Sequence, residues 1–379
     1  MKRLNNLYDN TYNLDNIMKM TDRVCTRVNN KEKVARFEIY KSEHIVNIYN
    51  RLKNRNFELG KYNIFMITDP KCRIVMAQEI EDKIVNHLIS EYNLVKTFEP
   101  KFTNSMIATR VGKGTLYGVK LLKKYLNEMK ENYDNFYVLK IDISKYFYSM
   151  DHNVLKNILR RKIKDKDALS VLFKIIDSTN EDYINKKIIT LKNNRINYLK
   201  NSNLTDKDNL IQETEEVPLY KHGRGCAIGN QSSQAFGLIY LYELVHFIKE
   251  KLGIKHLCVY MDDFIIIHND KEYLKKCLKI IKYKLENEFN LKINHKKTKI
   301  DSIKDGIDFL GYNFYIKDGK VILKHRNRTK RKFKKKIKDL TELRNYKYIS
   351  SKEFNELSAS YNGVLKWGDC GSLRYNCFK

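Results

Sequence analysis

Residues 256–268 read His-Leu-Cys-Val-Tyr-Met-Asp-Asp-Phe-Ile-Ile-Ile-His, two apolar runs separated by a short acidic segment. Val, Ile, Tyr and Phe favour strands, and the short separation predicts an antiparallel hairpin between 256–260 and 264–268. Strands this apolar are expected to be buried, where an ionised carboxylate is costly unless a cation or hydrogen bonds compensate it. Adjacent Asp262 and Asp263 at the hairpin tip therefore indicate a functional site. On these residues alone an ordinary Asp-Asp turn is an equal alternative.

A second acidic position follows another apolar run. Residues 136–141, Phe-Tyr-Val-Leu-Lys-Ile, predict a strand, and Asp142 comes directly after it. Strand-borne carboxylates that are distant in sequence are the arrangement that holds two divalent ions for in-line displacement at phosphorus. Mg²⁺ prefers such oxygen ligands. The pattern favours nucleotidyl transfer, with a helix N-cap as the alternative for Asp142.

Composition narrows the class of partner. The chain has 379 residues, with 73 Lys+Arg against 45 Asp+Glu, a formal charge of +28. A polyanion is the default partner of such a chain, either nucleic acid or an anionic membrane surface, although base-composition drift also raises Lys. No apolar run approaches the ~20 residues that span a bilayer, and no secretory signal opens the chain. Seven scattered cysteines without a CxxC pair predict a reducing, cytoplasmic location rather than disulfides or zinc.

The order of these motifs, from about residue 60 to 315, resembles that of bacterial-type reverse transcriptases. Tyr-Met-Asp-Asp at 260–263 is similar to the family's palm hairpin, and Asp142 matches its first acidic residue. The resemblance implies an α+β right-hand polymerase fold, with an antiparallel palm sheet packed on helices and a helical thumb. It implies RNA-directed DNA polymerase activity with two Mg²⁺ ions, for which Mn²⁺ could substitute. The implied metal ligands are Asp142, Ile143 through its carbonyl, Asp262 and Asp263.

The resemblance also divides the chain into domains. The expected segments are a helical N-terminal extension (1–60), fingers (61–135), palm (136–315) and thumb (316–379). Within the palm, residues 178–216 are polar and rich in Asn, Lys and Glu. We interpret them as an insertion or mobile loop.

Two further segments resemble nucleotide-binding motifs. Lys71 and Arg73 match the fingers residues that hold the triphosphate, since Lys supplies a point charge and Arg a bidentate fork. Phe147, five residues after Asp142, matches the aromatic that packs under the sugar and excludes a 2′-hydroxyl. Deoxynucleotides are therefore the expected substrate.

The glycine-bearing loop 223–234 precedes an apolar helix, which lets backbone approach a nucleotide or template closely. Its Ile228 and Gly229 would contact the nucleotide. The loop is similar to that of diversity-generating retroelement enzymes and some phage-defence reverse transcriptases. In the former, an apolar residue at the position of Ile228 goes with error-prone copying of template adenines.

Downstream, Lys297 matches the lysine that helps protonate the pyrophosphate leaving group, with Lys299 as the alternative. The stretch 324–338 is very basic, so salt-sensitive binding of a template–primer duplex is expected. The residues implied to bind template or primer are Arg110, Lys113, Ser233, Gln234, Tyr260, Met261, Leu310, Gly311, Arg328, Lys332 and Lys335.

The expected partners are an RNA template, a DNA or RNA primer and a dedicated non-coding RNA. A small accessory protein and a homo-oligomer are compatible with the sequence, and no membrane partner is expected. The resemblance favours a diversity-generating retroelement, with phage-defence or retron-like enzymes as alternatives. A non-catalytic RNA-binding scaffold is the alternative of another class, against which the three intact carboxylates count. Phe147 disfavours an RNA-templated RNA polymerase.

Overall fold

The computed structural model describes residues 3–378, with side chains up to Tyr375. Residues 1 and 2 of the predicted N-terminal extension and residue 379 of the predicted thumb lie outside the described residues. The chain forms two compact units. The first comprises Met1–Met106, Ile143–Ile248 and Ile281–Asn294, and the second comprises Ile107–Asp142, Lys249–Ile280 and His295–Lys379. Each unit is therefore assembled from segments that are far apart in the sequence.

The first unit is mainly helical and carries an antiparallel hairpin of β1 (Asn63–Ile67) and β2 (Arg73–Ala77). Its helices are α1 (Leu7–Thr11), α2 (Leu14–Arg27), α3 (Lys31–Ile39), α4 (Lys41–Lys53), α5 (Ile80–Leu88), the π-helical η1 (Ile89–Val95), α6 (Lys96–Phe98), the 3-10 turns η2 (Glu99–Lys101) and η3 (Ser178–Asn180), α8 (Tyr146–Ser149), α9 (His152–Arg160), α10 (Lys166–Asp177), α11 (Asp182–Lys200) and α12 (Lys207–Glu215). Two more helices, α13 (Gln231–Glu250) and α14 (Lys271–Asn287), contribute residues to both units.

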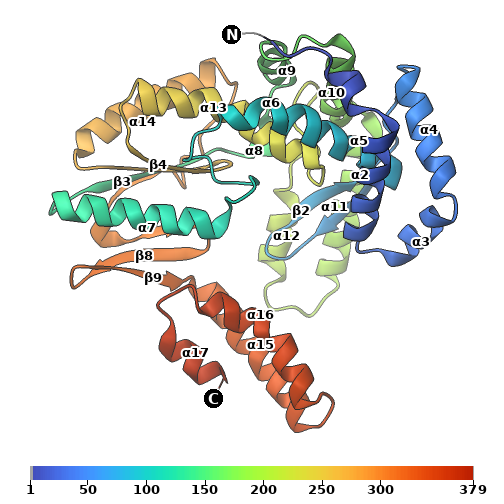
Figure 1. The fold of residues 1–379 in the computed structure, drawn as a ribbon. Helices are drawn as coiled ribbons and strands as arrows, with labels where there is room; N and C mark the ends of the chain where they lie inside the picture. Colours follow the sequence, from blue (N-terminus) through green and yellow to red (C-terminus); the bar gives the residue numbers. More distant parts are fainter. Residues whose placement is uncertain (1–2, 379) are drawn as a thin grey trace. The chain divides into compact units, whose positions relative to one another are not determined.

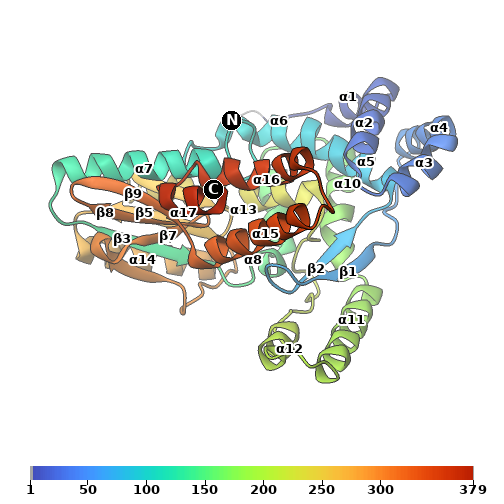
Figure 2. The same cartoon turned by 90° about the horizontal axis from the view of Figure 1, so that it is seen from below.

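Residues 178–216 form η3, α11 and α12 with short connecting segments, so the mobile-loop alternative is wrong, and the insertion stays a prediction. Helices α11 and α12 lie side by side (Figure 2). Ile184 and Ile188 of α11 are 0% exposed and pack with Ile64 and Ile74 of the β1–β2 hairpin. Asn193 and Asn194 of α11 are exposed, and Asn there costs a helix only about 0.7 kcal/mol relative to Ala. Burial of the apolar stripe outweighs that cost.

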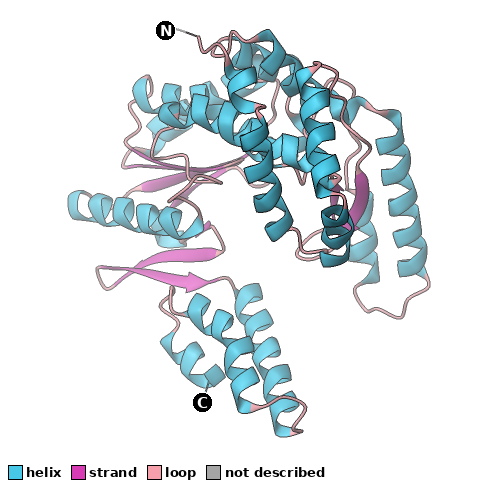
Figure 3. Cartoon of the chain, turned by 45° about the vertical axis from the view of Figure 1, so that its right-hand side comes forward, coloured by secondary structure: helices cyan, strands magenta, loops and turns pink. Residues whose placement is uncertain are grey.

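The second unit contains two antiparallel sheets, with strand orders β4-β5-β3-β6 and β7-β8-β9, drawn in magenta in Figure 3. The strands are β3 (Tyr137–Asp142), β4 (His256–Tyr260), β5 (Asp263–His268), β6 (Lys299–Ser302), β7 (Ile307–Phe309), β8 (Tyr312–Lys317) and β9 (Lys320–His325). The helices are α7 (Thr115–Asn132), the 3-10 turn η4 (Ile303–Asp305), α15 (Asn327–Asn345), α16 (Ser351–Leu365) and α17 (Gly371–Phe378).

Helix α7 lies between the two sheets of this unit (Figure 1). Leu122 and Leu126, one turn apart, are 0% exposed and share an apolar cluster with Ile265 of β5 and Phe314 of β8. Burying each such side chain contributes about 1.5–3 kcal/mol. The cluster fixes one helix against both sheets.

The predicted hairpin around residue 262 is confirmed. Tyr260 pairs with Asp263, which leaves Met261 and Asp262 as a two-residue turn. Met261 has φ 55°, the left-handed conformation that the first position of a tight hairpin turn often adopts. Antiparallel sheets packed on a helix, followed by a helical C-terminal segment, match the expected α+β class. No helix within residues 3–378 has the length and apolar character needed to cross a bilayer.

Candidate active site

Strands β3 and β5 bring two of the predicted carboxylates together. Asp142, the last residue of β3, and Asp263, the first residue of β5, are paired positions in antiparallel register. Asp262 immediately precedes Asp263 in the hairpin turn. All three carboxylates therefore lie at one end of the four-stranded sheet.

The three carboxylates repel one another in a poorly solvated place. Asp142 is 6% exposed. Burial, followed by the charge of Asp263, raises the pKa of Asp262 from 3.8 to about 6. Burial also raises the pKa of Asp263, and the charge of Asp142 adds to that effect. The raised pKa values of Asp262 and Asp263 mean that a nearby cation would stabilise their ionised forms.

A lysine side chain supplies positive charge at Asp142. Lys297 Nζ donates to Asp142 Oδ2 at 2.9 Å, and the Asp142 backbone N–H donates to Thr298 Oγ1 at 3.3 Å. The alternative acid, Lys299, forms its ion pair with Asp301 at 2.5 Å instead. Of the two predicted lysines, Lys297 is thus the one in contact with the carboxylates.

A second lysine, Lys140, was missed as a site residue. Its Nζ lies 3.9 Å from Asp263 Oδ1 and donates to the backbone oxygen of Asp308 at 2.9 Å. Its positive charge lowers the pKa of Asp263, against the effect of burial. The signal was available, since the period of two along a strand puts Lys140 and Asp142 on the same face of β3.

The donor chemistry of the site fits a divalent cation. Within the part of the chain that the structure describes, no group of three or more His, Cys, Asp or Glu side chains is arranged to hold an ion. Asp262 nevertheless has no ion-pair partner among the described side chains, and hard carboxylate oxygens are what Mg²⁺ prefers. The carboxylates would have to close around an ion, and Asp142 would have to share or release Lys297. Ile143 belongs to the first unit, where its backbone pairs with that of Ile293.

The first unit carries the residues predicted to contact the nucleotide. Lys71 lies in the β1–β2 turn and Arg73 opens β2, and both are exposed. The Met76 backbone N–H of β2 donates to the Ile228 oxygen at 2.8 Å. Gly229 has φ 126°, and a Cβ there would lie 2.7 Å from the Met76 oxygen. The structure therefore joins the glycine loop to the strand that carries Arg73.

Phe147, on α8, is half-buried and lies edge-on to Tyr146, with ring centroids 5.4 Å apart. Its carbonyl accepts the Cys226 N–H at 2.7 Å, which brings it next to the same glycine loop. Two other predicted residues lie on α13. Ser233 is 3% exposed, whereas Gln234 is exposed, so only Gln234 presents its side chain to solvent.

Arg110 and Lys113 lie in the loop before α7, and the start of this loop is attached to the β4–β5 hairpin. The Ile107 backbone N–H donates to the Val259 oxygen at 2.9 Å, one residue before the Tyr-Met-Asp-Asp stretch. Lys113 Nζ lies 3.8 Å from the ring centroid of Tyr117. The hydrogen bond attaches the chain that leads to Arg110 and Lys113 to this hairpin.

The Leu310–Gly311 turn joins β7 to β8 with φ values of 52° and 87°. A Cβ on Gly118 of α7 would lie 2.6 Å from Leu310 Cδ1, so the helix approaches the turn closely. The Arg326 backbone N–H donates to the Gly311 oxygen at 3.2 Å. The turn is thereby attached to the start of α15, on which the remaining predicted residues are exposed: Arg328, Lys332 and Lys335.

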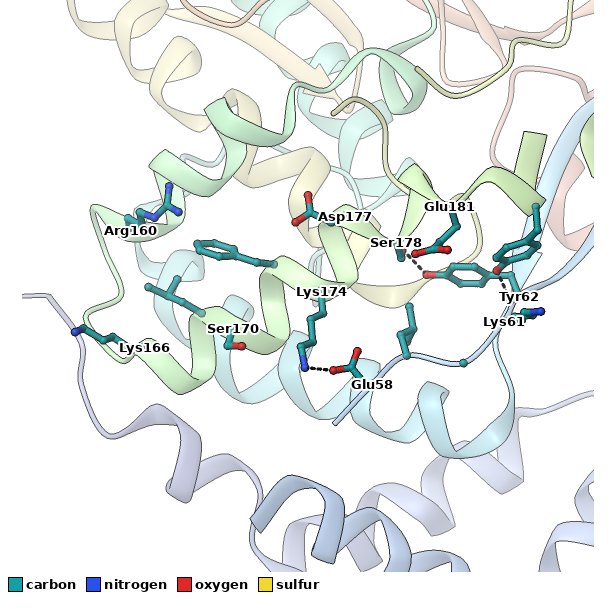
Figure 4. Close-up of a pocket in the computed structure, with 15 residues that line it drawn as sticks. Glu58, Lys61, Tyr62, Arg160, Lys166, Ser170, Lys174, Asp177, Ser178 and Glu181 are labelled. Atoms are coloured by element: carbon teal, nitrogen blue, oxygen red, sulfur yellow. Dashed lines mark hydrogen bonds and ion pairs between the residues drawn. The ribbon is translucent and has the colours of Figure 1, made fainter. Parts of the chain in front are cut away.

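A cavity of about 760 Å³ in the first unit has none of the predicted site residues in its lining (Figure 4). Lys174 Nζ contacts Glu58 Oε1 at 2.5 Å across part of it. Tyr62 Oη and Ser178 Oγ are hydrogen-bonded at 2.9 Å elsewhere in its lining. These contacts join α10 and η3 to the chain before β1, and we assign the cavity no chemical step.

An antiparallel sheet that ends in three carboxylates is packed on a helix and followed by a helical segment, an arrangement that matches the expected right-hand polymerase fold. The chain belongs to the reverse transcriptase (RNA-dependent DNA polymerase) family, whose model matches residues 61–314. This match covers the carboxylates and the hairpins described above.

Two individual proteins resemble the chain at lower similarity. The COX1/OXI3 intron 2 protein of Saccharomyces cerevisiae is 25% identical over 210 residues, which cover 48% of this chain and 24% of that protein. The chain therefore spans about a quarter of the length of this curated relative. The structure of apo telomerase from Candida tropicalis, truncated from its C-terminal domain, is 16% identical, with a TM-score of 0.44, and the match covers 73% of this chain and 58% of that one.

Proposed function

We propose that this protein is an RNA-directed DNA polymerase that extends a primer by two-metal nucleotidyl transfer. The observation that carries the proposal is the register of β3 and β5, which pairs Asp142 with Asp263 and leaves Asp262 beside them. Membership of the reverse transcriptase family supports an RNA template and deoxynucleotide substrates.

In this proposal the carboxylates of Asp142, Asp262 and Asp263, with the Ile143 carbonyl, hold two Mg²⁺ ions or Mn²⁺ as a substitute. Bound there, the ions would supply activation of the primer 3′-hydroxyl and neutralisation of charge on the leaving phosphates. Lys297, once it leaves Asp142, donates a proton to the pyrophosphate oxygen. Its Nζ already donates to Asp142 Oδ2 at 2.9 Å, so in this proposal it exchanges that carboxylate for a pyrophosphate oxygen as its acceptor.

The substrate-side residues act by charge and shape. Lys71 and Arg73, both exposed, bind the triphosphate, and Phe147 packs under the sugar. Ile228 and Gly229 contact the nucleotide from the loop that is hydrogen-bonded to β2. The RNA template and the DNA or RNA primer contact Arg110, Lys113, Gln234, Tyr260, Met261, Leu310, Gly311, Arg328, Lys332 and Lys335, whereas the buried side chain of Ser233 supports Gln234 from within α13.

The test is extension of oligo(dT) on poly(rA) by wild type and Asp262→Asn in the presence of Mg²⁺. We expect the variant to lose extension while its affinity for RNA is unchanged, because a carboxylate ligand is removed and no basic residue is touched. Extension that persists in the variant would refute the mechanism. A wild-type protein that binds RNA but extends nothing would favour the non-catalytic scaffold. Replacing dNTPs by rNTPs in the same assay tests the sugar selection assigned to Phe147.

We further propose that the enzyme works with a dedicated non-coding RNA in a diversity-generating retroelement, with a small accessory protein. Ile228 supports this choice over phage-defence or retron-like enzymes, which are the alternatives. The six cysteines whose side chains are described are free thiols, which suits the proposed cytoplasmic location. Sequencing the RNA and DNA that copurify with the protein tests the role, and cDNA with substitutions confined to template adenines is the expected result. Faithful cDNA copies would contradict it.

A further inference from the structure

We propose that His152 and Tyr62 are positioning residues for the glycine loop (223–234), through which nucleotide binding is proposed to occur. Each side chain links this loop by hydrogen bonds to one of two consecutive residues, Asp177 and Ser178, at the junction of α10 and η3. Neither side chain contacts the nucleotide in this proposal, and both act through the loop. The role rests on the proposed polymerase function, because it requires a loop that contacts a nucleotide.

The ring of His152 lies between the glycine loop and the end of α10. It is 2% exposed, with Nε2 2.7 Å from the Gly225 oxygen and Nδ1 3.1 Å from Asp177 Oδ1. A carbonyl oxygen only accepts, so we assign a proton to Nε2. Burial lowers the pKa of His152, and a neutral ring with its proton on Nε2 keeps the bond to the loop. Lys156 Nζ holds Asp177 at 2.5 and 2.6 Å, which fixes the carboxylate beside the ring.

Tyr62, directly before β1, forms the second link. Its side chain is 6% exposed, and its hydroxyl lies 2.9 Å from Asn230 Nδ2 and 2.9 Å from Ser178 Oγ, the latter contact drawn in Figure 4. Because the Asn230 amide donates, the Tyr62 oxygen accepts from the loop and donates its own proton to Ser178. Ser178 Oγ donates in turn to the Ile175 oxygen at 2.7 Å. This chain of hydrogen bonds joins the residue after Gly229 to α10.

The next two residues of the junction contact the same loop directly. Thr179 Oγ1 donates to the Gly225 oxygen at 3.0 Å, and Asn180 Oδ1 accepts the Gly223 backbone N–H at 2.8 Å. Four consecutive residues, 177–180, therefore contact the loop either directly or through one intervening side chain. The junction is a support for the loop as well as a connection between two helices.

The position of this loop sets the predicted nucleotide contacts. The Cys226 backbone N–H donates to the Phe147 oxygen at 2.7 Å, and the Ile228 oxygen accepts the Met76 backbone N–H from the strand that carries Arg73 at 2.8 Å. The three glycines of the loop all have positive φ. Glycine has the most conformational freedom to lose, so the loop needs outside contacts to keep one geometry. Loss of these contacts should therefore weaken nucleotide binding.

The first test uses Tyr62→Phe, which removes one hydroxyl and keeps the ring. In the poly(rA)/oligo(dT) assay we expect the KM for dTTP to rise about 5- to 30-fold, equivalent to ~1–2 kcal/mol for an unpaired buried partner. The kcat should change by less than about 3-fold, since no contact to the three carboxylates is removed. Hydrogen exchange of the Cys226 and Met76 amides, which attach the loop on either side, should accelerate. The matched control is Tyr8→Phe, because the buried Tyr8 hydroxyl donates to a backbone oxygen outside the loop, that of Leu52, at 2.7 Å.

The second test compares two His152 variants of similar length. His152→Gln keeps a donor that reaches the position of Nε2, so its KM should stay within about 3-fold of wild type, whereas His152→Met fills the space without a donor and should raise KM about 5- to 30-fold. Rescue by Gln but not by Met separates the bond to Gly225 from packing. The matched control is His246→Met, since His246 Nε2 lies 2.8 Å from the Lys101 backbone oxygen, outside the loop.

Unchanged exchange of the Cys226 and Met76 amides in Tyr62→Phe or in His152→Met overturns the inference. It is also overturned if exchange accelerates while KM stays at the wild-type value, or if His152→Gln is impaired as much as His152→Met. A wild-type protein that extends no primer refutes the proposed polymerase function instead. Exchange of the loop amides needs no catalysis, so it still decides whether Tyr62 and His152 hold the loop.

Discussion

Replacing Asp262 by Asn should abolish the proposed chemistry and yet make the metal-free protein more stable. Burial and the neighbouring Asp263 raise the pKa of Asp262 from 3.8 to about 6, roughly two units. At 1.36 kcal/mol for each unit, the ionised carboxylate costs the fold roughly 3 kcal/mol at neutral pH. An Asn side chain has the same shape and no charge. Because its amide also needs hydrogen-bond partners, we expect a net gain of about 1–3 kcal/mol.

The gain should depend on pH in a defined direction. An acid whose pKa is higher in the folded protein takes up a proton on folding, so its protonated form is favoured in the native state. The wild-type protein therefore loses stability as pH rises through 3.8 and through about 6, and regains it on acidification. The advantage of Asp262→Asn should be greatest above pH ~6 and should vanish below pH ~4.

The measurement is urea unfolding in EDTA at several pH values, followed by fluorescence of Trp367, the chain's single tryptophan, which belongs to the second unit. The matched control is Asp318→Asn in the β8–β9 turn, where φ is 49° and Asn adopts the left-handed conformation readily. That exposed substitution should change stability by less than about 0.5 kcal/mol. Saturating Mg²⁺ should stabilise wild type more than Asp262→Asn.

Two outcomes would refute this reasoning. One is a variant that is less stable than wild type at neutral pH without metal, which would mean that Asp262 is stabilising when ionised. The other is a stability difference that does not change between neutral and acidic pH, which would mean that its charge is irrelevant to the effect.

Two further substitutions test other parts of the site. Lys297→Met removes the cation from Asp142. Because the Lys297 side chain is 53% exposed, we expect a loss of only about 1–2 kcal/mol in the free energy of unfolding in the same assay. An unchanged unfolding midpoint would show that the ion pair is not stabilising. Gly229 has φ 126°, and Gly229→Ala would place a Cβ 2.7 Å from the Met76 oxygen. The clash should weaken the hydrogen bond from the Met76 amide to Ile228, so exchange of that amide should accelerate by about 30-fold or more, equivalent to ~2 kcal/mol. Gly363→Ala in α16, where nothing lies within 4 Å of the added methyl, is the control and should stabilise its helix by about 0.5–1 kcal/mol.

The local sequence pattern predicted secondary structure correctly where one face of a strand or helix is buried by nearby residues. The alternation and apolar content of 256–268 predicted the β4–β5 hairpin and its acidic tip, because strand pairing over a short turn is a local event. The same reasoning failed for α11 and α12, where polar residues suggested a loop. Their helical state depends on burial of Ile184 and Ile188 against β1 and β2, which are more than a hundred residues away in sequence.

The three carboxylates of the candidate site could be singled out from the chain alone, because Asp142, Asp262 and Asp263 each follow or interrupt an apolar strand. Tertiary structure decided how these residues meet. The register of β3 with β5 sets which carboxylates are neighbours, and residues of both strands share one apolar cluster with α7. The contacts of Lys140 and Lys297, and the raised pKa of Asp262, depend on interatomic distance and on exclusion of water. A sequence specifies which groups carry charge, whereas only the folded chain sets the distances and solvation that determine their interaction.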